Sequence, residues 1–230
     1  MRITYFATFH GAAALTETDR ARVVALVRAT PRLAEARVYT PARAHDPYLD
    51  DGAAPALALQ LYFADIADLE AALARDGHLQ ALAAPDALPG LAGATVEQQA
   101  MLARDFPVPD ARLRTPAGGL PCTYLVHYAG VADDTNQWLA YYIAHHPGIM
   151  ARLPDIRQIE ICTRIDWCGF LPWPRVDHMQ RNKVVFDSPA ALTAALNSPV
   201  RHELRTDYAQ FPPFRGDNRH YPMATLAVMP

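Results

Sequence analysis

The most constraining feature of this 230-residue sequence is that its second half repeats the first. Three segments recur in the same order and at nearly the same spacing: 4–11 resembles 123–130, 31–40 resembles 154–163, and 61–73 resembles 184–196. Internal similarity of this kind indicates two structural units of one type. The length allows one large domain or two of roughly 100 residues each, and the repeat favours two halves that bury one shared core.

A segment rich in proline and glycine separates the two halves. Residues 105–121 contain Pro107, Pro109, Pro116 and Pro121 together with two glycines, and these residue types interrupt both helices and strands. We therefore divide the chain into a degenerate half (1–104), a linker (105–121) and a better preserved half (122–230).

Each half shows the same succession of strand, helix, strand, strand, helix and strand. We expect strands at 4–9, 36–40, 57–63, 94–99, 122–128, 157–164, 181–186 and 223–228, and helices at 17–29, 65–75, 135–150 and 188–196. Thr16 is a typical N-cap, and Pro189 follows Ser188 as the first residue of a predicted helix. The order βαββαβ predicts an α+β, ferredoxin-like arrangement, an antiparallel sheet with both helices on one face.

The alternation within the strands predicts how the two sheets meet. Ile159 and Ile161 share one face of their strand, whereas Glu160 lies on the other. The apolar faces should pack on the helices, so the polar faces of the two halves should meet each other and enclose a partly polar space. Two alternatives stay open for its interior: a lumen that holds a small ligand, or a closed, hydrogen-bonded interface.

Composition excludes several classes of protein. The chain is 51% hydrophobic and 20% charged, which indicates a folded globular protein. A net charge of -3 gives no basic excess, so we expect no nucleic-acid partner, and no window approaches the roughly 18 apolar residues of a membrane span. The N-terminus lacks the pattern of a signal peptide, and the three cysteines cannot form a complete disulfide framework, so we expect reduced thiols and a cytoplasmic location.

Several short motifs of the second half resemble one known family. They are an aromatic helix that ends in histidine, proline and glycine (138–149), a turn with proline (153–156), a strand that leads into a helix (184–192) and a later aromatic segment (207–211). Over about 122–228 the chain is similar to the EthD-like family of the dimeric α/β-barrel superfamily. The resemblance implies a barrel normally built from two chains, here a fused pseudo-dimer. Relatives include isomerases, cyclases, dehydratases and metal-free oxygenases that modify rings, and, more distantly, haem proteins.

The two halves have diverged unequally, which predicts one asymmetric site. All three tryptophans and six of the nine histidines lie in the second half. His146 matches the histidine of the family pattern and is our candidate acid/base, since imidazole exchanges protons near neutral pH. Its alternative role is a histidine that interacts with the carboxyl end of its helix. His145 points about 100° away around the helix and should do a different job.

Other candidates surround His146. Tyr142 lies four residues earlier on the same helical face, and an alternative for it is ordinary aromatic packing. His127 and Tyr128 end a strand on opposite faces, so one of them should reach the lumen. Glu160 and Arg164 either line the lumen or form an ion pair between the sheets.

A long connection at 166–178 carries Trp167, Trp173 and His178. Long loops often act as lids, so we expect these three side chains to contact substrate; the alternative is a surface clamp. No CxxC or HExxH motif is present and adjacent histidines do not share a helical face, so no metal site is predicted.

These observations predict a cofactor-independent enzyme for a small cyclic or aromatic catabolite bound in the barrel lumen. Its reaction would be proton transfer of the isomerase, cyclase or lyase type, with His146, Tyr142 and His127 as catalytic residues and Tyr128 among the binding residues. One alternative is a non-catalytic binding or accessory protein. A second is a haem-binding or oxygenase-like protein that uses His146 or another histidine of the lumen. A homodimer of the fused chain is left open.

Overall fold

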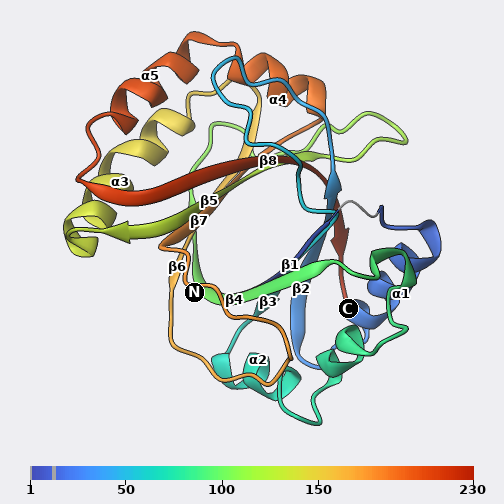
Figure 1. Cartoon of the computed structure of the whole chain (residues 1–230). Coiled ribbons are helices and arrows are strands. Elements are labelled where there is room, and N and C mark those ends of the chain that lie inside the picture. Colours follow the sequence, from blue (N-terminus) through green and yellow to red (C-terminus); the bar gives the residue numbers. More distant parts are fainter. Residues whose placement is uncertain (1, 12–13) are drawn as a thin grey trace.

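Eight antiparallel strands close into a barrel in the computed structural model, which describes residues 2–11 and 14–230 (Figure 1). The strands are β1 (Arg2–His10), β2 (Leu33–Pro41), β3 (Leu57–Phe63), β4 (Thr95–Phe106), β5 (Cys122–Ala132), β6 (Ile156–Arg164), β7 (Gln180–Phe186) and β8 (Phe214–Val228). Their order around the barrel is β1-β3-β2-β8-β5-β7-β6-β4. The helices lie outside it: α1 (Glu17–Arg28), α2 (Ile66–Ala72), α3 (Thr135–Met150), α4 (Pro189–Leu196), α5 (Pro199–Tyr208) and the 3-10 helices η1 (His78–Ala83) and η2 (Pro89–Leu91).

The two strands that join the halves, β4 and β8, are longer than the sequence patterns predicted. β4 continues to Phe106 because its second part pairs with β6 of the other half, with Leu102 opposite Thr163. β8 pairs with both β5 and β2, and its last residues, such as Val228, lie opposite β2 residues, such as Ala36. The expected helices are present, whereas α5 and both 3-10 helices were not predicted.

Side chains alternate between the helix-covered outside of the barrel and its inside. On β1, Tyr5 and Phe9 belong to a core that includes Val23 of α1, whereas Phe6 belongs to a separate interior cluster. The same alternation holds on β6, where Ile159 packs under the second set of helices and Cys162 lies inside. The barrel therefore has two outer cores, one under α1 and α2 and one under α3, α4 and α5.

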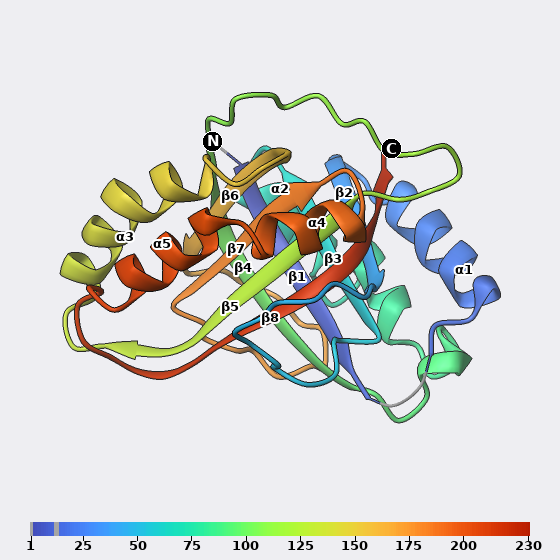
Figure 2. The same ribbon diagram turned by 90° about the horizontal axis from the view of Figure 1, so that it is seen from above.

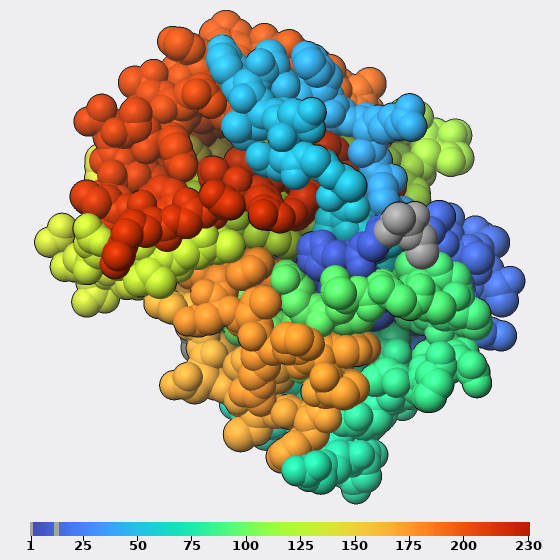
Figure 3. Space-filling model, viewed as in Figure 1, coloured from blue at the N-terminus to red at the C-terminus, as the bar shows by residue number. Residues whose placement is uncertain are grey.

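Two long loops each join two strands of one half and pack against the other half. The segment 42–56 between β2 and β3, here the first crossing loop, lies against the C-terminal part of the chain (light blue against orange and red in Figure 3). The segment 165–179 between β6 and β7, here the second crossing loop, packs on the core of the first half. Each crossing loop thus covers the half from which it does not come.

The connection between β4 and β5 runs along one end of the barrel (Figure 2). β4 ends at Phe106 and β5 begins at Cys122, so residues 107–121 contain neither helix nor strand. No helix in the described part of the chain is both long and apolar enough to cross a bilayer.

Candidate functional site

Helix α3 places three aromatic side chains in one buried row. Trp138, Tyr142 and His146 are spaced by four residues, and the centroids of neighbouring rings lie 5.2 Å and 4.8 Å apart. Asp134 caps the start of the helix, and its side chain accepts a hydrogen bond from the Gln137 amide at 3.0 Å. The row faces the outer surface of β5 and β7, so it lies outside the barrel rather than in its lumen.

His146 forms a buried pair with a carboxylate that sequence patterns missed. Its Nδ1 lies 2.7 Å from Oδ2 of Asp207 on α5, and Tyr141 donates a hydrogen bond to Oδ1 of the same carboxylate at 3.1 Å. Burial lowers the pKa of His146, and the nearby Asp207 opposes that shift only in part. The imidazole is therefore neutral at pH 7 and can accept a proton. His145 is exposed and stacks on Tyr141 instead.

A narrow cavity of about 60 Å³ lies beside this pair, between α3, α4, α5 and the sheet. Its lining combines apolar side chains with a few polar ones, among them Tyr128, Tyr142, His146, Asn182, Arg201 and His220. Since one water occupies roughly 10–15 Å³ by such a measure, the space admits a few non-hydrogen atoms as it stands. A single ring enters only if flexible lining side chains such as Met150 move.

The hydroxyl groups in the cavity are arranged as donors. Asn182 donates its amide to the Tyr142 hydroxyl at 2.5 Å, and the rings of Tyr128 and Tyr142 meet edge to face. Burial raises the pKa of both tyrosines well above its usual value. Both phenols are therefore protonated at neutral pH and can donate a hydrogen bond to an oxygen of a bound molecule.

The first crossing loop supplies carboxylates to the rim of the same cavity. Asp46 accepts hydrogen bonds from Arg201 at 2.8 Å and from Tyr124 at 3.0 Å. Asp51 lies 2.8 Å from Nδ1 of His220; burial would raise its pKa, but the hydrogen bonds and charge of His220 together with Arg219 outweigh burial and lower it. Residues of the first half thus hold Tyr124, Arg201 and His220, which line the cavity in the second half.

The second crossing loop does not act as a lid on this cavity, contrary to our expectation. Trp167 packs edge-on against Tyr5 at 5.8 Å, and Trp173 against Phe9 at 5.4 Å. Gln98 of β4 donates hydrogen bonds to backbone carbonyls of the loop, which fixes it to the first half. Because the loop belongs to the core of the first half, Trp167 and Trp173 are not positioned to bind substrate at His146.

The barrel lumen is largely filled by side chains. Glu160 accepts hydrogen bonds from Gln60 at 2.7 Å and from Tyr62 at 2.8 Å, and it lies 3.3 Å from the ammonium of Lys183. Burial would raise the pKa of Glu160, but Lys183, Tyr62 and other neighbours outweigh it and lower the pKa. Of the two alternatives for the interior, the structure favours the closed, hydrogen-bonded interface. Arg164 pairs with Asp177 at the surface, 2.8 Å away.

One end of the barrel opens into a cavity of about 290 Å³ next to the linker. Lys183 contributes to its lining, but the ammonium is already engaged by Glu160 and by the Tyr62 hydroxyl. No histidine lines this cavity, so it lacks the neutral imidazole that makes the outer cavity suitable for proton transfer.

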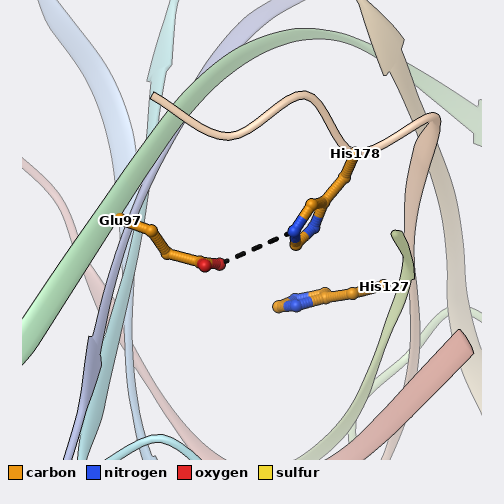
Figure 4. Close-up of side chains that lie close together, drawn as sticks. All are labelled: Glu97, His127 and His178. Atoms are coloured by element: carbon orange, nitrogen blue, oxygen red, sulfur yellow. Dashed lines mark ion pairs between the residues drawn. The ribbon is translucent and has the colours of Figure 1, made fainter. Parts of the chain in front are cut away.

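His127 and His178 lie together on the inner side of the barrel, away from His146. Their ring centroids are 5.4 Å apart, and Nε2 of His178 lies 3.9 Å from Glu97 of β4 (Figure 4). Burial and the nearby Arg181 lower the pKa of His127 well below its usual value and that of His178 to about 4. His127 is the one of the pair His127 and Tyr128 that faces inward, so it cannot act at the same site as His146.

Comparisons with known proteins find similarity at the level of structure only. No known protein family matches the chain, and no curated protein matches it. The solved structure of an anthrone oxidase-like protein superposes with a TM-score of 0.63 at 13% identity, covering 98% of this chain and 92% of that one. A candidate monooxygenase from Lactobacillus acidophilus gives a TM-score of 0.52 at 11% identity, covering 99% and 96%. A candidate chlorite dismutase gives 0.53 at 11% identity, covering 98% and 95%. The chain therefore shares the fold of these proteins.

Proposed function

We propose that this protein is an enzyme that moves a proton on a small organic molecule bound beside His146. The observation that carries the proposal is the buried pair of His146 and Asp207 at the edge of a cavity between α3, α4, α5 and the sheet. Asp207 binds Nδ1 and so fixes the imidazole in one orientation, which leaves Nε2 to exchange a proton with a bound molecule. Catalytic histidines are commonly oriented in this way by a carboxylate.

The chemistry that fits these groups is proton abstraction next to a carbonyl. Nε2 of His146 accepts a proton from carbon, and a tyrosine hydroxyl donates a hydrogen bond to the carbonyl oxygen where negative charge develops. Return of the same proton to another carbon completes an isomerisation, and its delivery to a departing hydroxide completes an elimination of water. Neither reaction needs an oxidant or a reductant.

The comparisons support an enzyme that processes a small molecule, but they do not select the reaction. The neighbouring structures are described as oxidase-like, monooxygenase and chlorite dismutase proteins. Haem, which our second alternative required, does not fit the cavity beside His146, because about 60 Å³ is far too small for a porphyrin. We therefore derive no reaction step through haem.

We also propose that the chain arose as a fused pair of ferredoxin-like halves related to the EthD-like family, with the linker at 105–121. The strand orders support this origin. Within the closed order, β1, β2, β3 and β4 are adjacent as β4-β1-β3-β2, and the second half repeats the pattern as β8-β5-β7-β6. The two halves then carry the same scaffold with different side chains, and the second places His146 next to a cavity.

The test begins with a thermal-shift screen of small carbonyl compounds, both cyclic and acyclic, followed by turnover assays on the hits. We expect His146→Ala to lower kcat by about 10²–10⁴-fold with an intact fold, the usual contribution of a general base. His145→Ala is the matched control, because His145 is exposed on the same helix. Ligand binding without turnover in the wild type would favour the non-catalytic binding protein. Turnover that is unchanged in His146→Ala would remove His146 from the mechanism.

A further inference from the structure

A second group of chemically active side chains lies on the inner side of the barrel and has no part in the proposed reaction. Glu97 of β4, His127 of β5 and His178 of the second crossing loop each offer one donor atom, and these atoms all lie within 4.8 Å of one another. Figure 4 shows the carboxylate and the two imidazole rings around one common space. Three segments that are distant in sequence are therefore brought together by closure of the barrel.

The histidines of this group lack the partners that buried polar groups normally have. Nε2 of His127 and Nδ1 of His178 are buried and form no hydrogen bond within the described part of the chain. His127 is only 4% exposed. Since buried polar groups are nearly always paired, the unpaired nitrogen of His127 indicates that something binds next to it.

The second oxygen of the Glu97 carboxylate and access from solvent allow that occupant to be a cation, although Arg181 already pairs with the first oxygen. Arg181 donates a hydrogen bond to Oε1 of Glu97 at 3.0 Å, which leaves Oε2 for a second positive partner. His10 lies 3.7 Å from Oε1 and offers a further imidazole at the rim. The side chains of Glu97 and His178 are 21% and 13% exposed, so an ion can reach the group from solvent.

We propose that Glu97, His127 and His178 bind one divalent transition-metal ion of the Zn²⁺ or Fe²⁺ kind. Two neutral imidazoles and one carboxylate form the donor set that such ions prefer, with positions left for water. Bonds of about 2.0–2.2 Å place ligand atoms roughly 3–4 Å apart, so the group must contract slightly. His178 can move toward the ion because it lies on a loop. The site is independent of the proposed function, since His146 lies on the outer face of the sheet.

The test measures metal binding directly on the whole chain. Protein dialysed against EDTA is titrated with ZnCl₂ by calorimetry, and Co²⁺ is added separately to record its visible absorption. We expect one ion per chain and Co²⁺ bands typical of mixed nitrogen and oxygen ligands. His178→Ala and Glu97→Gln should each weaken Zn²⁺ binding at least tenfold and remove the Co²⁺ bands, whereas His202→Ala, an exposed histidine on α5, should leave both unchanged.

Thermal unfolding provides an independent readout. An ion that binds only the folded chain raises the melting temperature, so Zn²⁺ should stabilise the wild type and His202→Ala but not Glu97→Gln. If His178→Ala fails to fold, Glu97→Gln, which keeps the shape of the side chain, decides whether the group binds Zn²⁺. Fewer than 0.5 ions per chain in the wild type, or the same isotherm in Glu97→Gln, would overturn the proposal and assign any binding to surface groups.

Discussion

The charged pair inside the barrel provides a quantitative test of whether the lumen is structural. Glu160 is completely buried, and Lys183 is 3% exposed at a separation of 3.3 Å. Removing one member of a buried pair leaves an uncompensated charge, which costs about 3–5 kcal/mol of the free energy of unfolding. Glu160→Gln, which keeps the shape of the side chain, should fall in this range. Lys183→Met should cost less, because Arg2 still pairs with Glu160 at 2.8 Å.

The double variant separates the charge effect from packing. Glu160→Gln with Lys183→Met removes both charges, so its loss should be smaller than the sum of the single losses by at least about 2 kcal/mol. Urea unfolding at pH 7 measures these values, and a melting temperature lower by about 6–20 °C should accompany Glu160→Gln in a chain of this size. Losses below about 1 kcal/mol in both single variants would show that water enters the lumen, and the interior would again be a candidate ligand site.

Three further outcomes follow from the outer cavity and the crossing loops. Because the pKa of His146 is lowered in the folded chain, the unfolded chain binds more protons below about pH 6.5, so the free energy of unfolding should fall as the pH drops through this range, and less so in His146→Gln; an equal fall between pH 7 and pH 5 in the wild type and in His146→Gln, measured by urea unfolding, would contradict this. Asp207→Asn should lower kcat with little change in KM and shift the pH profile of kcat, because Asp207 positions His146; a change confined to KM would assign Asp207 to binding. Trp173→Ala should cost about 1–3 kcal/mol, less than a fully buried tryptophan, since its ring is only partly buried against Phe9; an unchanged melting temperature would show that the loop does not stabilise the first half.

The alternation was sufficient to predict where the eight strands lie and which faces they bury, but not the full length of β4 and β8. Period-two patterns depend on local geometry, so the sequence alone assigns Ile159 and Ile161 to the helix side of β6. The four-residue spacing likewise predicted that Tyr142 and His146 share a face of their helix. Both patterns depend only on the residues of one strand or one helix, so they can be predicted from a single segment of the sequence.

The partner of His146 could not be predicted in the same way. Asp207 reaches His146 from α5, which is 61 residues away and was not expected as a helix. The sequence does contain a start signal, because Ser198 precedes Pro199 at the first turn. The pairing itself depends on how α3 packs against α5, and no local pattern encodes that packing. The same applies to Glu97, which meets His127 and His178 only when the barrel closes.

The position of the cavity follows from what each crossing loop brings to the opposite half. The second crossing loop carries Trp167, Leu171 and Trp173, which join the core under the first set of helices. The first crossing loop, residues 42–56, contains no tryptophan or phenylalanine and has alanine at five of its fifteen positions. It therefore fills less of the second half and contributes carboxylates such as Asp46 and Asp51 instead. We infer that the exchanged loops, rather than the sheets themselves, determine where space and charge remain in the two halves.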